Sequence, residues 1–238
     1  MATQKTFIAV AGNIGTGKTT LTEMLSQKFK WEAHYESVKD NPYLEDFYLD
    51  MKRWSFPLQI FFLNHRFKAH QEISEGLKSS IQDRSIYEDA NIFARNLHEQ
   101  QHMEKRDYLN YLDLYERMST FLSPPDLIIY LRKSVPRLQQ QILKRGRTFE
   151  QKIPQKYLQD LNGYYDEWMS SYSIGKKLII DTDDLDFVKN QADFDSIAQQ
   201  VINALDQRDL FLHSNTITTP LTMAQRIKNA ESHAQSFA

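Results

Sequence analysis

The stretch Val10-Ala-Gly-Asn-Ile-Gly-Thr-Gly-Lys-Thr-Thr20 decides how this chain folds. It satisfies the pattern G-x-x-x-x-G-K-[ST], whose glycines let backbone N–H groups turn toward an anion. An apolar run, residues 7–11, precedes the stretch, and apolar residues at helical spacing follow it from Leu21 to Phe29. Because a strand, a glycine loop and a helix occur in this order, the stretch predicts a phosphate-binding loop and not an ordinary strand-to-helix turn.

The residues of this loop have individual expected roles. Lys18 would reach the β- and γ-phosphates of a nucleotide, and the Thr19 hydroxyl would ligate Mg²⁺. The start of the following helix adds about half a positive charge. The ATP contacts that we expect from the loop are Gly12, Asn13, Ile14, Gly15, Thr16, Gly17, Lys18, Thr19 and Thr20.

Composition excludes several classes of protein. The chain has 238 residues, 41% of them hydrophobic, which suits one α/β domain or two small ones. No apolar run approaches the roughly 18 residues of a membrane span, and no signal-peptide core is present. The chain has no cysteine and a net charge of −2, so it has no disulfides and no electrostatic preference for nucleic acid. We therefore expect a cytoplasmic protein without membrane or nucleic-acid partners.

Five short segments have the composition of strands. Helical periodicity separates them, which predicts an α/β fold with a five-stranded parallel sheet flanked by helices. The second segment is the most polar, so it should lie at an edge of the sheet. The expected strands are residues 7–11, 31–36, 79–83, 126–131 and 177–181.

Two helices are expected between the second and third strands. One would run from about residue 41 to 54, and Pro57 would begin the next, because proline is tolerated in a first helical turn. In the second helix Gln59 and Arg66 are seven residues apart and share a face. With many aromatic residues nearby, this face would either line a pocket for a flat polar ligand or form an exposed polar stripe.

Acidic residues follow two of the expected strands. Glu36 and Asp83 come at the carboxyl end of the sheet, where ligands bind in open α/β folds. Glu36 is a candidate general base, or a solvated or capping group, and Asp83 is a candidate for organising Mg²⁺. Glu88 and Asp89 follow at the start of a helix, where the helix dipole favours carboxylates.

The second half of the chain contains an aromatic helix and a basic segment. The helix at about 104–121 should pack in the core or at a dimer face. A later helix runs into Lys144, Arg145 and Gly146, which form either its C-terminus or a mobile lid over phosphates. We expect one phosphate-loop domain at 1–207, with this lid at about 144–152, and a tail at 208–238.

In combination, these motifs resemble the deoxynucleoside kinases, a family that includes deoxycytidine, deoxyguanosine, mitochondrial-type thymidine and bacterial deoxyadenosine kinases. The likeness extends from about Phe7 to Phe187. It rests on GNIGTGKTT, NPYLEDFY, a Gln-x6-Arg helix, DRSIYED, the lid RGR and IPQKYLQDL, in that order. DNPYLEDFY and the Asp before Arg-Ser are most similar to the bacterial deoxyadenosine branch. The resemblance implies a P-loop kinase fold, ATP with Mg²⁺, a deoxynucleoside substrate and a homodimer.

The resemblance also implies roles for single residues. Glu36 matches the general base for the sugar 5′-hydroxyl, Arg84 the arginine that holds it, and Asp83 the Mg²⁺-organising carboxylate. With Lys18, Glu36 and Arg84 form the implied catalytic set. The further nucleoside contacts are Tyr48 and Asp160 at the 3′-hydroxyl and Gln59, Arg66, Asp89 and Phe93 at the base. The further ATP contacts are the lid residues Arg145 and Arg147 and, near the adenine, Asp183 and Phe187.

The implied reaction is transfer of the γ-phosphoryl group of ATP to the 5′-hydroxyl of a deoxynucleoside. Arg66 and Asp89 suit an amino-bearing base better than thymine, so we expect deoxyadenosine first, with deoxyguanosine or deoxycytidine as secondary substrates. One alternative is a nucleoside monophosphate kinase resembling thymidylate kinase, whose acceptor phosphate Glu36 would repel. Another is a catalytically silent, kinase-like structural subunit, which would be expected to lose Lys18 or Glu36.

Overall fold

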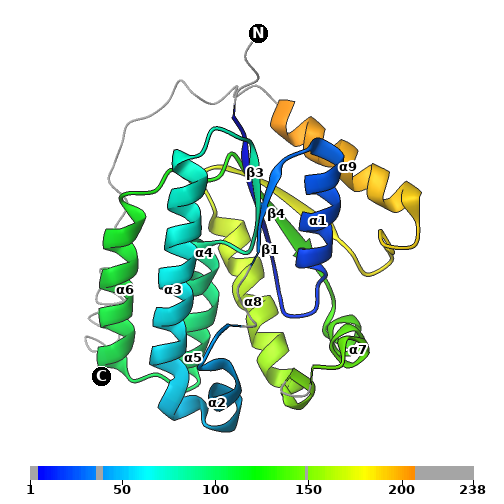
Figure 1. Ribbon diagram of the computed structural model, residues 1–238. Helices are drawn as coiled ribbons and strands as arrows, with labels where there is room; N and C mark the ends of the chain where they lie inside the picture. The colour runs from blue at the N-terminus through cyan, green and yellow to red at the C-terminus, as the bar shows by residue number, and fades with distance from the viewer. Residues whose placement is uncertain (1–4, 36–39, 148–149, 207–238) are drawn as a thin grey trace, which may run out of the picture.

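Five strands form one parallel sheet in the computed structural model, which describes residues 5–35, 40–147 and 150–206. Their spatial order is β2-β3-β1-β4-β5, and every neighbouring pair is parallel (Figure 1). This confirms the predicted fold class, including the edge position of the second strand. The strands are β1 (Phe7–Gly12), β2 (Glu32–His34), β3 (Ser80–Asp83), β4 (Leu127–Arg132) and β5 (Lys176–Asp181).

Helices cover both faces of the sheet (Figure 1). The longer ones are α1 (Lys18–Phe29), α3 (Met51–Glu75), α6 (Lys105–Ser119), α7 (Val135–Arg145), α8 (Gln155–Ser171) and α9 (Gln191–Asp206). The shorter ones are α2 (Leu44–Leu49), α4 (Ile86–Glu88), the π-helix η1 (Asp89–Ala94), α5 (Arg95–Glu99) and the 3₁₀ turn η2 (Glu150–Lys152).

The two faces of β1 belong to two hydrophobic clusters, as the two-residue period of a strand requires. Ile8 and Val10 pack with residues of α1 and α9 on one face. Ala9 and Ala11 pack on the other face with residues of α3, α6 and α8. Tyr111 of the aromatic helix α6 is fully buried in this second cluster. This helix therefore contributes to the core, which is one of the two positions that the sequence analysis expected for it.

The predicted helix boundary near Pro57 was wrong. α2 ends at Leu49, α3 begins at Met51, and Pro57 lies inside α3. The boundary lies at Asp50, whose backbone is extended and whose side chain accepts a 3.0 Å hydrogen bond from the Arg53 N–H as an N-cap. Proline removes one hydrogen bond from the helix, but burial of the apolar residues that follow it on α3 outweighs this loss.

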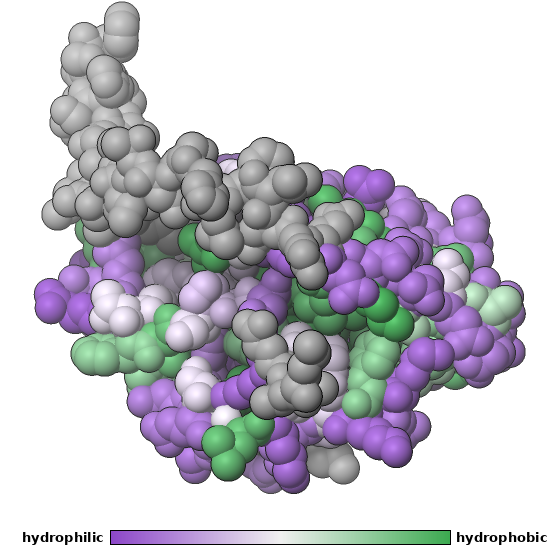
Figure 2. Space-filling model, turned by 90° about the horizontal axis from the view of Figure 1, so that it is seen from above, coloured by the Kyte–Doolittle hydropathy of each residue, from purple (hydrophilic) through white to green (hydrophobic). Residues whose placement is uncertain are grey.

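No helix within the described ranges combines the length and apolar character needed to cross a membrane. On the face shown in Figure 2, hydrophilic residues prevail around the rim and hydrophobic residues form smaller patches between them. The expected tail at 208–238 lies outside the described residues, so the predicted domain boundary stays a prediction.

Candidate active site

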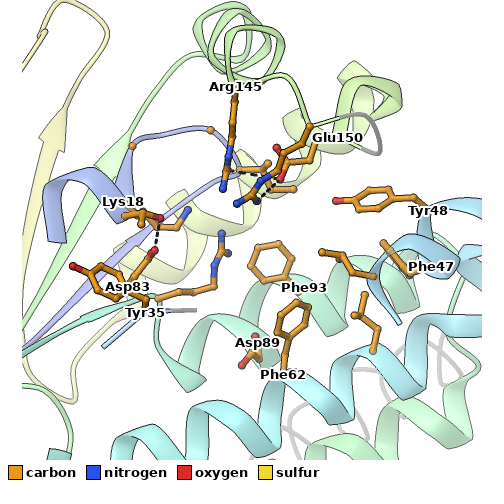
Figure 3. A pocket seen from close by; sticks show the side chains of 18 of the residues that line it. Lys18, Tyr35, Phe47, Tyr48, Phe62, Asp83, Asp89, Phe93, Arg145 and Glu150 are labelled. Carbon is orange, nitrogen blue, oxygen red and sulfur yellow. Dashed lines mark hydrogen bonds and ion pairs between the residues drawn. The ribbon is translucent and has the colours of Figure 1, made fainter. Parts of the chain in front are cut away.

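A pocket of about 870 Å³ lies at the carboxyl ends of β1 and β3. Segments far apart in the sequence line it: the glycine loop, α2, α3, the end of β3, η1, and the end of α7 with the segment that follows it (Figure 3). The predicted site residues that meet in this pocket are Ile14, Gly15, Gly17, Lys18, Thr19, Thr20, Tyr48, Gln59, Arg66, Asp83, Arg84, Asp89, Phe93, Arg145 and Arg147.

The glycine loop adopts a backbone that demands glycine. Gly17 has φ of 99°, and a Cβ there would lie 3.1 Å from the Phe187 ring. α1 begins directly after it, at Lys18, whose Nζ donates a 2.8 Å hydrogen bond to the Asn13 carbonyl. The Asn13 amide in turn donates to Asn162 Oδ1 at 2.8 Å, which fastens the loop to α8. The hydrogen bonds of Lys18 and Asn13 therefore fix the conformation of the loop at the pocket.

The first turn of α1 meets the end of β3 at a potential magnesium site. Thr19 Oγ1 donates a hydrogen bond to Asp83 Oδ2, and Lys18 lies beside Asp83 at this end of the pocket (Figure 3). Asp83 Oδ1 is buried and has no hydrogen-bond partner among the described residues. The described residues contain no group of three His, Asp or Glu arranged around a metal. This donor set fits Mg²⁺, which combines one or two carboxylates with substrate phosphates and water.

Arg84 lines the pocket and has a strained backbone. Its φ is 70°, unusual for a residue with a Cβ, and its N–H donates to the Val10 carbonyl at 2.9 Å. The buried guanidinium donates to the Tyr165 hydroxyl at 3.0 Å and lies 4.4 Å from the Phe93 ring centroid. Such strain is retained where the surrounding contacts hold a functional group in place.

The opposite end of the pocket is aromatic and carries buried polar groups. Arg66 and Asp89 form a buried ion pair, and the Arg66 guanidinium lies 4.9 Å from the Phe62 ring centroid. Gln59 is 3% exposed, so the helix face that carries Gln59 and Arg66 is not an exposed polar stripe. Gln59 Oε1 and Asp89 Oδ2 have no hydrogen-bond partner within the described part of the chain. Two acceptors without donors beside a flat aromatic slot suit a heteroaromatic ring with an amino group.

The basic segment after α7 contains a residue that the sequence analysis missed. Glu150 is 5% exposed, and its Oε1 lies 2.9 Å from Arg147 Nη1 and 3.7 Å from Arg145 Nη1. Its other oxygen has no hydrogen-bond partner among the described residues. Glu150 and Tyr48 both project into the pocket (Figure 3). The signal available in the sequence was a carboxylate three residues after Arg147, within the expected lid.

Some predicted site residues lie elsewhere. Asp160 does not line the pocket, because its carboxylate pairs with Lys156 one helical turn away and accepts a 3.0 Å hydrogen bond from Gln100. Asp183 accepts a 2.8 Å hydrogen bond from the Ser134 N–H and lies outside the pocket. Glu36 lies outside the described residues, one position after Tyr35, which lines the pocket.

Two pKa shifts describe the electrostatics around the pocket. Burial raises the pKa of Tyr157, a lining residue, to about 12, so its hydroxyl stays protonated at neutral pH. Burial also acts to raise the pKa of Asp183, but hydrogen bonds from Ser134 and the positive charge of the nearby Lys133 outweigh it, and the pKa is lowered. Asp183 is therefore a stable anion at the start of the loop that follows β5.

Comparisons with known proteins agree with this geometry. A family model described as deoxynucleoside kinase matches residues 8–206. The chain is 36% identical over 204 residues to a deoxyadenosine/deoxycytidine kinase of Bacillus subtilis, covering 85% of this chain and 94% of that protein. It is 41% identical over 203 residues to a deoxyguanosine kinase of the same organism, covering 82% and 95%.

A solved structure supports the same assignment. Deoxyadenosine kinase from M. mycoides, with the products dCMP and a flexible dCDP bound, superposes with a TM-score of 0.74 at 31% identity, covering 83% of this chain and 99% of that chain. These matches span nearly the whole length of each relative and confirm the resemblance noted in the sequence. The chain therefore belongs to the deoxynucleoside kinase family.

Proposed function

We propose that this kinase transfers the γ-phosphoryl group of ATP to the 5′-hydroxyl of a deoxynucleoside that carries an amino group on its base. One observation carries the proposal: a single pocket has a phosphate loop with Lys18 at one end and an aromatic slot with Gln59 and Asp89 at the other. A triphosphate and a nucleoside bound at these two ends would meet near Arg84, which also lines the pocket.

The phosphate end supplies positive charge and orientation. Lys18 would release the Asn13 carbonyl and contact the β- and γ-phosphates, while Arg84 would stabilise charge on the transferred group. Mg²⁺, held by Thr19 and Asp83 together with the phosphates, would neutralise negative charge there. Arg145 and Arg147 would add charge from the lid.

The acceptor end orients the sugar and its base. Glu36 remains the proposed general base for the 5′-hydroxyl, from its position after β2 and its match to the family motif. For the 3′-hydroxyl we propose Tyr48 with Glu150 in place of Asp160, because the first two line the pocket and the third does not. Gln59 Oε1 and Asp89 Oδ2 would accept hydrogen bonds from the amino group of the base.

A substrate panel tests this function. We expect phosphorylation of deoxyadenosine, deoxyguanosine and deoxycytidine, with deoxyadenosine ranked first by kcat/KM, and little activity with thymidine, which has no amino group. A dominant thymidine activity would contradict the assignment of the base slot. The corresponding deoxynucleoside monophosphates, tested in the same assay, decide the alternative of a monophosphate kinase. The homodimer, the cytoplasmic location and the lack of nucleic-acid or membrane partners stay predictions.

A further inference from the structure

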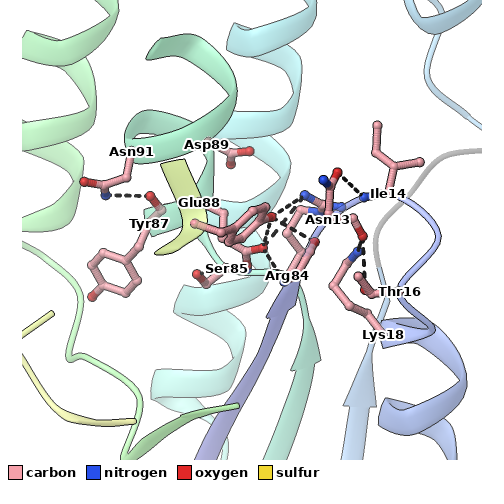
Figure 4. Close-up of polar contacts among 12 residues, drawn as sticks. Asn13, Ile14, Thr16, Lys18, Arg84, Ser85, Tyr87, Glu88, Asp89 and Asn91 are labelled. Atoms are coloured by element: carbon pink, nitrogen blue, oxygen red, sulfur yellow. Dashed lines mark hydrogen bonds and ion pairs between the residues drawn. The ribbon is translucent and has the colours of Figure 1, made fainter. Parts of the chain in front are cut away.

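Glu88 is a fully buried carboxylate that the proposed reaction does not use. It is the third residue of α4, and its Oε2 accepts a 2.8 Å hydrogen bond from the Ser85 N–H, which completes a capping box. Its Oε1 accepts from the Gly12 N–H at 3.2 Å and from the Tyr165 hydroxyl at 2.6 Å. Figure 4 shows Glu88 beside Ser85 and Arg84. Capping α4 requires only the first of these contacts, so the other two need a separate explanation.

Tyr165 links the same carboxylate to the catalytic side of the pocket. Its buried hydroxyl lies 2.9 Å from the Gly12 carbonyl, 2.6 Å from Glu88 Oε1 and 3.0 Å from Arg84 Nη1. The hydroxyl has one proton to donate, to Glu88 or to Gly12, and it accepts from Arg84. Burial raises its pKa well above the usual value, so the proton stays in place at neutral pH.

We propose that Glu88 and Tyr165 are positioning residues that hold the Arg84 guanidinium in register with the first glycine of the phosphate loop. This rests on the proposed function, in which Arg84 stabilises the transferred phosphoryl group. Glu88 Oε1 lies 3.8 Å from Arg84 Nη1 and accepts a hydrogen bond from the Gly12 N–H. One carboxylate therefore contacts both Arg84 and the phosphate loop and fixes their relative position. A displacement of about 1 Å in such a group can lower the rate about 100-fold.

The chemistry of Glu88 fits this role better than an amide would. Both of its oxygens face N–H donors, of Gly12 on one side and Ser85 on the other. A carboxylate accepts with both oxygens, whereas glutamine would turn an NH₂ group toward one of the donors. Its negative charge also compensates the Arg84 guanidinium, which is only 6% exposed.

Tyr165→Phe is the most selective test, because it removes one oxygen and keeps the ring stacked on Tyr130 at 5.3 Å between centroids. The matched control is Tyr111→Phe. Tyr111 is as deeply buried, but its hydroxyl has no hydrogen-bond partner in the described part of the chain. We expect Tyr165→Phe to lower kcat about 10- to 100-fold with KM for ATP within about twofold, and Tyr111→Phe to leave both unchanged.

A double-mutant cycle separates positioning from a general structural role. In an Arg84→Lys background, Tyr165→Phe should have less than about a third of its effect on kcat, because the guanidinium that Tyr165 positions is no longer present. An equal effect of Tyr165→Phe in both backgrounds would overturn the positioning role, and so would an unchanged kcat in the Tyr165→Phe single variant. In either case, turnover of deoxynucleosides by the wild-type enzyme would still support the proposed function. Wild-type protein that phosphorylates no deoxynucleoside would contradict the proposed function, and the positioning role with it.

Discussion

The Arg66 guanidinium on α3 and the Asp89 carboxylate on η1 form an ion pair whose side chains are only 6% and 1% exposed. The two residues are 23 positions apart and meet because α3 packs against η1. A charge buried this deeply is costly unless a partner compensates it. The pair therefore sets both the polarity of the base slot and a part of the stability of the fold.

Asp89→Asn should destabilise the protein strongly. It leaves the buried Arg66 without a compensating charge, and we expect the free energy of unfolding in urea to fall by about 3–5 kcal/mol. The control is Asp113→Asn, which breaks the exposed pair with Arg117, whose side chains are 59% and 75% exposed. That variant should unfold close to the wild-type midpoint. Equal midpoints for the two variants would show that the buried pair contributes little.

Glu36→Gln should lower kcat by about 10²–10⁴-fold, the usual contribution of a general base. Binding of ATP, measured by calorimetry, should persist, because the phosphate loop does not contain this residue. Single-turnover kinetics distinguish the chemical step from product release. A variant with near-normal kcat would remove Glu36 from the role of base.

Glu150→Gln and Asp160→Asn decide which carboxylate holds the sugar. We expect Glu150→Gln to raise KM for the deoxynucleoside, because Glu150 lines the pocket with Tyr48. The loss of one hydrogen bond to a charged group corresponds to about 10- to 100-fold. Asp160→Asn should leave this KM near wild type, since its carboxylate pairs with Lys156 outside the pocket. If Asp160→Asn raised this KM and Glu150→Gln did not, Asp160 would be the residue that holds the 3′-hydroxyl, as the family motif implied.

Stability should fall as the pH drops below about 6.5, in part because of His70. Its Nε2 donates a 2.7 Å hydrogen bond to the Ser123 carbonyl, and its buried Nδ1 has no partner among the described residues. Burial lowers the pKa of His70 below its ordinary value of 6.5, although the bond to Ser123 acts the other way. Below pH 6.5 the unfolded chain therefore binds a proton at His70 that the folded chain does not, which favours unfolding.

Urea unfolding between about pH 5.5 and 7.5 measures this effect. The free energy of unfolding should rise with pH across this range in the wild type and rise less steeply in His70→Gln. Some slope should remain, because burial also lowers the pKa of His34. An identical slope in both proteins would exclude His70 as a source of the pH dependence.

Sequence patterns that extend over a few residues were sufficient to predict the class of fold. The strand, the glycine loop and the helix that begins at Lys18 follow from hydrophobic periodicity and the need for positive φ at glycine, which act within a few residues. The same holds for Gly146, which ends α7 in the left-handed conformation. The boundary at Asp50 was missed because a capping aspartate was a weaker signal in the sequence than Pro57.

The sequence by itself determined the class of fold, the phosphate loop and the kind of residues at the site, because short-range spacing and residue chemistry specify these features. Only the tertiary structure decided that Glu150 and not Asp160 shares the pocket with Tyr48, and that Glu88 joins Gly12 to Tyr165. Such contacts join residues up to 153 positions apart, as between Gly12 and Tyr165. They depend on how α8 packs against α7 and η1, which no local pattern encodes.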